Sequence, residues 1–112
     1  MKKVFITQIP HRYNNETKKF VPSVNISAAE EHGELVVMLP PTASFHATED
    51  ITRQLRDKLK DYDYEAGDSI VFLGDPAIIA LACAILSHKF GRFTLLKWDR
   101  SLMRYLAARI IV

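Results

Sequence analysis

Apolar runs of strand length alternate with polar segments in the first third of the chain. Residues 4–9 are mostly apolar and rich in β-formers, and a proline follows them, which predicts a first strand. Residues 20–26 also look extended, but Pro22 restricts them to a sheet edge or an irregular arm. Residues 27–33 place Ser and Glu at capping-box spacing before a glycine, which predicts one short helical turn. We therefore expect an irregular arm over residues 10–33.

Two later segments, residues 34–39 and 69–73, each carry a continuous apolar run after a polar first residue. Continuous rather than alternating apolar runs predict strands that are buried on both faces. Between them, apolar residues recur at helical spacing from Thr48 to Tyr62, which predicts a helix with one apolar and one charged face. The apolar stripe of this helix consists of Ile51, Leu55, Leu59 and Tyr62.

A second helix is predicted directly after the second of these strands. Asp75 is a suitable N-cap, Pro76 a suitable first helical residue, and Gly91 a suitable residue to end the helix. Residues 92–98 and 103–112 then predict two strands joined by a short hairpin loop.

The chain has 112 residues, of which 48% are hydrophobic, so it can build one core but not two domains. Strands that alternate with helices favour parallel pairing with right-handed crossovers. We therefore expect one α/β domain over residues 1–112. Its elements are a small, mostly parallel sheet of four to five strands (order β-β-α-β-α-β-β), two main helices and an antiparallel C-terminal edge hairpin.

The second helix has no polar side chain from Ala77 to Leu86. A helix that is apolar all round needs cover all round, and the sheet and the first helix supply only part of it. A second copy of the chain would supply the rest, since obligate interfaces resemble a core cut in half. The alternative is that Phe20, Val21 and Val24 of the arm fold over the helix. The residues expected at a homodimer contact are Ile78, Leu81, Ala82, Ile85 and Leu86.

Charge and cysteine content exclude several classes of protein. Fifteen basic and thirteen acidic residues give a net charge of +2, which by itself does not argue for nucleic acid. The single cysteine, Cys83, excludes an intramolecular disulfide framework and fits a reducing compartment. The first apolar run stops at Thr7, too early for a signal peptide, and residues 77–86 reach half-way across a bilayer. We expect a cytoplasmic protein without a membrane segment.

In open parallel sheets, ligands bind beyond the carboxyl ends of the strands. A small-molecule or nucleotide site is therefore expected there, and a phosphate at Gly74-Asp75-Pro76 is the simplest version. The Asp75 carboxylate would repel an anion, however, and no glycine-rich phosphate motif is present, so we expect no cofactor. The candidate ligand-binding residues are Ser44, His46, Asp75, Asp99 and Arg100.

Nucleic-acid binding is a second alternative, because aromatic and basic residues mix on the C-terminal hairpin. Such mixtures can stack bases and follow phosphates. Strand alternation, however, puts Lys97 and Trp98 on opposite faces. The candidate nucleic-acid residues are Arg12, Lys97, Arg100, Arg104 and Tyr105.

Catalytic and metal-binding motifs are weak. Ser44 and His46 lie close in sequence, but no G-x-S-x-G elbow surrounds a serine. Cys83 lies in an apolar run, which is typical of packing rather than of nucleophilic chemistry. The four histidines lack ligand spacing, so we expect neither a metal site nor, on balance, an enzyme.

Four short segments, Phe72–Pro76, Leu95–Arg100, Ile9–Arg12 and Phe20–Pro22, resemble parts of short proteins of tailed bacteriophages. The resemblance implies no activity and no site residues. It implies a small protein made in an infected bacterial cell, where such proteins often bind a host or phage partner. Our leading interpretation is a non-catalytic accessory protein that self-associates and acts through protein contacts, with the ligand-binding and nucleic-acid interpretations as alternatives.

Overall fold

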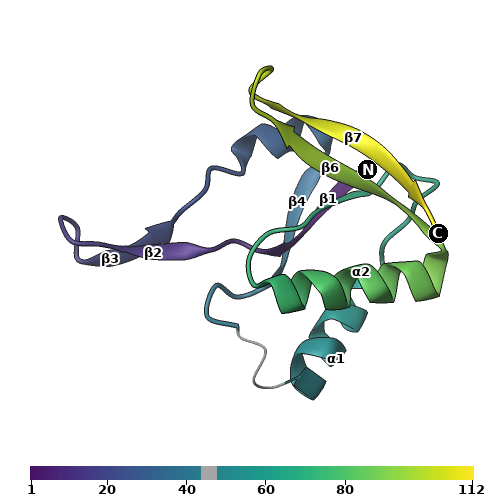
Figure 1. Cartoon of the computed structure of the whole chain (residues 1–112), viewed down its shortest axis with the longest axis horizontal. Helices are drawn as coiled ribbons and strands as arrows, with labels where there is room; N and C mark the ends of the chain where they lie inside the picture. The colour runs from purple at the N-terminus through teal and green to yellow at the C-terminus, as the bar shows by residue number, and fades with distance from the viewer. Residues whose placement is uncertain (44–47) are drawn as a thin grey trace.

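The computed structural model describes residues 1–43 and 48–112. Its seven strands, two α-helices and one 3₁₀ helix follow one another along the chain (Figure 1). In order, these are β1 (Lys3–Gln8), β2 (His11–Asn14), β3 (Lys19–Pro22), η1 (Ser27–His32), β4 (Glu34–Leu39), α1 (Thr48–Leu59), β5 (Ser69–Val71), α2 (Pro76–Phe90), β6 (Arg92–Asp99) and β7 (Arg104–Ile111).

A five-stranded sheet in the order β4-β1-β5-β6-β7 forms the centre of the molecule. β1 pairs in parallel with β4 and β5, β5 pairs in parallel with β6, and β7 runs antiparallel to β6 at the edge. The predicted α/β class, mostly parallel sheet, two main helices and antiparallel C-terminal hairpin are all confirmed.

The two helices cover one face of this sheet (Figure 1). The predicted stripe of α1 is buried there against strand residues such as Phe5, Ile70 and Phe93. Each fully buried Leu or Ile side chain of this kind stabilises the fold by about 1.5–3 kcal/mol. The opposite face packs Val4 and Ile6 against η1, whose Ala29 is fully buried.

Residues 10–33 are more regular than predicted. β2 and β3 form a two-stranded antiparallel hairpin, which extends away from the five-stranded sheet (Figure 1). Phe20 on this hairpin is 72% exposed, so the arm does not fold over α2 as the alternative required. The predicted Ser27 capping box is also absent from η1. Instead, the Asn25 side chain accepts hydrogen bonds from the amide and hydroxyl of Ser27.

The prediction that both continuous apolar runs are doubly buried is right for β5 and wrong for β4. All of β5 is buried, whereas β4 is an edge strand whose Val37 is 42% exposed. An apolar run records local composition but not the number of neighbours that a strand acquires. Among the described residues, no helix combines the length and apolarity needed to cross a bilayer.

Candidate functional site

The Gln8 side chain lies at the carboxyl end of the parallel strands, the edge where a ligand site was predicted. Gln8 is the last residue of β1 and is buried. Its Nε2 donates to the carbonyl oxygens of Ala43 (2.8 Å) and Pro40 (3.1 Å), and its Oε1 accepts from the Asp75 amide (3.0 Å). The amide side chain thus joins β1, the segment after β4 and the start of α2.

Two neighbours close this edge further. The Thr7 hydroxyl accepts a hydrogen bond from the Leu73 amide (2.8 Å) and donates one to the Leu73 carbonyl, which satisfies the backbone just past β5. Gly74 has φ +94°, and a Cβ there would lie 2.2 Å from Gln8 Oε1. The sequence pattern did not single out Thr7 and Gln8. A polar pair after an apolar run is typical of an exposed strand end, and the same pattern also fits buried side chains that bond distant backbone groups.

Three of the five predicted ligand-binding residues are described, and the two acidic ones cap local backbone amides. Asp75 caps α2 by accepting from the Ala77 amide (2.8 Å), as its sequence context predicted. Asp99 accepts from the Leu102 amide (2.9 Å) in the β6–β7 loop, where Arg100 is exposed. Ser44 and His46 lie outside the described residues.

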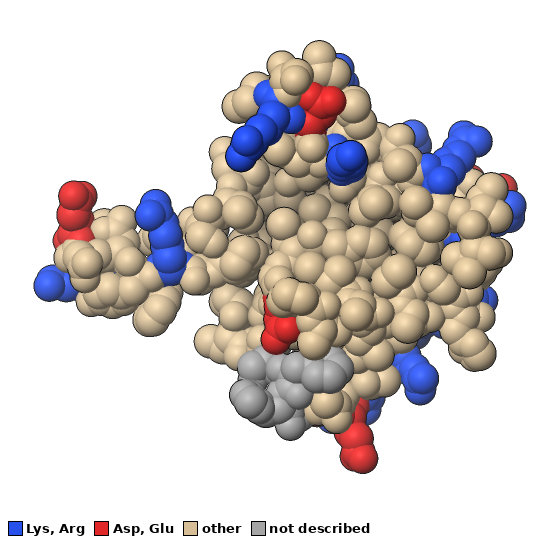
Figure 2. All heavy atoms as spheres, viewed as in Figure 1, with Lys and Arg blue, Asp and Glu red and all other residues tan. Residues whose placement is uncertain are grey.

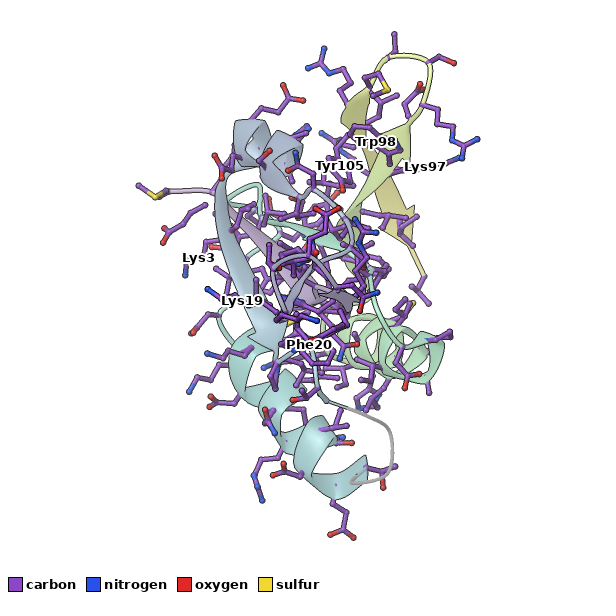
Figure 3. All side chains as sticks on the ribbon, turned by 90° about the vertical axis from the view of Figure 1, so that its left-hand side faces the viewer. Lys3, Lys19, Phe20, Lys97, Trp98 and Tyr105 are labelled. Carbon is purple, nitrogen blue, oxygen red and sulfur yellow. The ribbon has the colours of Figure 1, made fainter. Side chains whose placement is uncertain are left out.

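The predicted nucleic-acid residues are divided between two hairpins. Arg12 lies on β2, and the other four lie on or next to the β6–β7 turn. Arg104 forms an ion pair with Glu31 (3.1 Å). Tyr105 is buried and packs edge-to-face on Trp98, with ring centroids 5.0 Å apart, and burial raises the pKa of its phenol. The ring that is available at this hairpin is therefore Trp98, which is 39% exposed (Figure 3).

The β2–β3 hairpin exposes an aromatic pair. Tyr13 and Phe20 lie opposite each other in the ladder and pack edge-to-face at 5.3 Å, with both rings exposed. The turn is held by the Asn14 side chain, which accepts from the amides of Glu16 (2.8 Å) and Thr17 (3.2 Å). The base of the hairpin is closed by Ser23, whose amide and hydroxyl donate to the carbonyl before β2.

The β6–β7 turn exposes a second apolar group. Leu102 and Met103 project at the turn, and Trp98 lies beside them on β6. A cavity of about 320 Å³ adjoins Trp98, because β5 ends at Val71 while β6 continues to Asp99. The exposed large apolar side chains nearest the ends of the two hairpins are together called the hairpin surface, and they are Tyr13, Phe20, Trp98, Leu102 and Met103.

Most residues predicted at a homodimer contact pack inside the chain itself. Ile78, Ala82, Ile85 and Leu86 are buried in the core under the sheet, and only Leu81 is half-exposed. Within the apolar stretch 77–86 of α2, the exposed residues are Ala80 and Ala84. Exposing alanine costs little, so a helix without polar residues can leave this side open. Leu81, Ala84 and Ile85 line a groove of about 720 Å³ that also touches Arg56 of α1.

Metal-binding geometry is not found in the described part of the chain: no three His, Cys, Asp or Glu side chains cluster there. Cys83 is a half-buried free thiol.

A family model described as Phage Pam3 gp32-like protein matches residues 2–111, nearly the whole chain. The chain belongs to this family. The predicted resemblance to phage proteins is thereby confirmed. No curated protein and no solved structure matches the chain.

Proposed function

We propose that this member of the Pam3 gp32-like family is a non-catalytic binding protein that docks its hairpin surface onto a partner protein. The observation that carries the proposal is the exposure of aromatic and aliphatic side chains at the ends of two hairpins. Figure 2 shows these hairpins as separate projections with a notch between them. Folding leaves these side chains without cover, whereas a partner that buried them would gain free energy.

The composition of the hairpin surface resembles that of energetic centres in protein interfaces. Trp, Tyr and other large side chains dominate binding energy when a partner desolvates them. Phe20 is braced by Tyr13, and Trp98 by the buried Tyr105, so two of the rings are already ordered before binding. Pre-ordered side chains lose less conformational entropy on association.

Charge indicates the kind of partner. Residues 11–22 and residues 97–104 each carry three basic residues and one acidic residue, although the whole chain has a net charge of only +2. Lysine and arginine side chains are visible on both projections (Figure 2). The favoured partner surface is therefore apolar with an acidic rim, since complementary potentials speed association and select partners.

Nucleic acid is the second candidate, and it is favoured by the basic residues around the exposed rings. Bases stack on rings, but they gain little from aliphatic side chains. Leu102 and Met103 are among the most exposed apolar residues of the chain, and Tyr105, the ring predicted to stack, is buried. The aliphatic half of the surface thus supports a protein partner over a nucleic acid.

Self-association through α2 has weaker support than it had from the sequence. In a symmetric dimer built on the α1–α2 groove, Arg56 and Lys89 of one copy would lie near those of the other. Like charges at such an interface cost several kcal/mol. A light-scattering mass of the purified chain tests this point directly, and the proposal expects a monomer.

The proposed function is tested by affinity capture from infected cells, followed by binding measurements with the purified captured protein. Phe20→Ala and Leu102→Ala are each expected to weaken binding by about tenfold or more. Val37→Ala on β4 is the matched control, because Val37 is an exposed apolar residue away from both hairpins. Equal affinities for all three variants would refute the proposal, and binding of an oligonucleotide that Phe20→Ala weakens would favour the second candidate.

A further inference from the structure

A polar cavity of about 390 Å³ lies on the sheet face opposite the helices, at the amino-terminal ends of the parallel strands. Ser69 of β5 and Leu96 of β6 line it from buried positions, and Thr94 of β6 is half-buried beside them. Lys2, before β1, and Arg109, on β7, line it from exposed positions, and His32 contributes from the end of η1. Five segments therefore place polar side chains around one space, at the opposite end of the strands from the edge where Gln8 lies.

Strand register explains why these side chains share a face. Ser69 pairs with Val4, and both alternate with Phe5 and Ile70, which face the helices. Lys2 is two residues before Val4 and therefore lies on the same side of the strand. A Cβ at Gly67 would lie 2.9 Å from the Lys2 side chain, so the lysine stem crosses this glycine at the cavity.

The Ser69 hydroxyl is the first indication of a ligand. Ser69 is 3% exposed, and its Oγ has no hydrogen-bond partner. Within residues 1–43 and 48–112, no other buried side-chain oxygen or nitrogen lacks one. A buried unpaired hydroxyl is costly and infrequent in folded proteins, which indicates that a further group completes the site.

The charge of the cavity is the second, independent indication. Lys2 and Arg109 form no ion pair with any described carboxylate, and none of the described lining residues is acidic. His32 is held in place by its Nε2, which donates to the Tyr105 carbonyl (2.9 Å). The nearest carboxylate to that ring, Glu31 at 3.5 Å, is already bound by Arg104.

We propose that this cavity binds the phosphate group of a small phosphate monoester. The Ser69 hydroxyl donates to a phosphate oxygen, and Lys2 and Arg109 neutralise the negative charge. The planar guanidinium of Arg109 suits two phosphate oxygens at once. The volume lies near the lower end for ligand sites, so the group attached to the phosphate is small. This site is separate from the hairpin surface and does not depend on the proposed function.

The test is a titration of the isotope-labelled full chain with inorganic phosphate, followed by amide chemical shifts. We expect saturable shifts at Ser69, Thr94 and Ala107, with a dissociation constant of roughly 1 mM for so small a ligand. Arg109→Gln is expected to weaken binding by about tenfold or more. The matched control is Arg100→Gln, which removes an exposed arginine outside the cavity.

A second variant separates a ligand site from a structural role. Ser69→Ala removes the unpaired hydroxyl, so the phosphate-free protein is expected to melt at the same or a higher temperature, while phosphate binding falls by about tenfold. The proposal is overturned if phosphate gives no saturable shift at the amides of Ser69, Thr94 and Ala107. The partner of the Ser69 hydroxyl would then be a water molecule only. Equal weakening by Arg109→Gln and Arg100→Gln would also overturn it, since that result indicates diffuse attraction to positive charge.

Discussion

Replacing Gln8 by leucine removes the side chain that joins three segments at the carboxyl edge of the sheet. Leucine keeps most of the volume but none of the hydrogen bonds. The amide of Gln8 has two N–H groups for the carbonyls after β4, and its oxygen serves the Asp75 amide. Each of the three lost hydrogen bonds lowers the free energy of unfolding by about 1 kcal/mol, and the backbone groups left without a partner lower it further. The expected total loss is about 3–5 kcal/mol.

A loss of this size is a large part of the 5–15 kcal/mol that typically separates folded from unfolded domains. Urea unfolding followed by circular dichroism is expected to show the midpoint lowered by about 1–5 M. Gln54→Leu is the matched control, because Gln54 lies on α1 and bonds only the Asp50 side chain (2.8 Å). We expect the control to change stability by less than about 0.5 kcal/mol. The role assigned to Gln8 is refuted if Gln8→Leu lowers the free energy of unfolding by less than about 1 kcal/mol, or if Gln8→Leu and Gln54→Leu lower it equally.

Three further predictions concern other parts of the fold. Gly74→Ala is expected to lower the free energy of unfolding by more than about 2 kcal/mol, and Gly91→Ala by only about 1–2 kcal/mol. Both glycines have positive φ, but of the two only Gly74 has neighbouring atoms where a Cβ would lie. Thermal melting of the two variants measures the difference. Burial raises the pKa of Tyr62, so its contribution to stability is complete below about pH 10 and is lost as the pH rises through its folded-state pKa. Tyr62→Phe is expected to lower stability by about 1–3 kcal/mol at neutral pH, through the lost bond to the Thr94 amide (2.9 Å), and to flatten the alkaline decline; an unchanged pH profile would contradict this. Phe20→Ser is expected to leave the free energy of unfolding within about 0.5 kcal/mol, since its ring lies outside the core, and a larger loss in urea unfolding would show that the hairpin supports the body.

Local patterns predicted the elements whose signals are themselves local. The α1 stripe is fully buried, and Asp75, Pro76 and Gly91 begin and end α2 as expected. The β6–β7 hairpin follows from two strand patterns separated by a few polar residues. These features depend on contacts a few positions apart, which spacing records directly.

Contacts between distant segments were not predictable in the same way. Nothing in the run of β4 shows that it gains only one neighbour, whereas the similar run of β5 gains two. The role of Gln8 depends on carbonyls more than thirty residues later and on an amide 67 residues later. The contacts of Gln8 escaped prediction for the same reason: the ends of the parallel strands do meet, but the side chain that joins them came from a strand that offered no motif.

The position of β1 has a consequence for synthesis of the protein. In the sheet, Val4 of β1 pairs with Leu35 of β4 on one side and with Ser69 of β5 on the other. Both partners follow it along the chain. During translation the β2–β3 hairpin closes locally, while β1, which is almost fully buried in the folded protein, leaves the ribosome before either of its neighbours exists. Pairing across such separations is slow, and an unpaired apolar strand invites aggregation and chaperone binding. The period of vulnerability of the nascent chain ends only when β5 emerges.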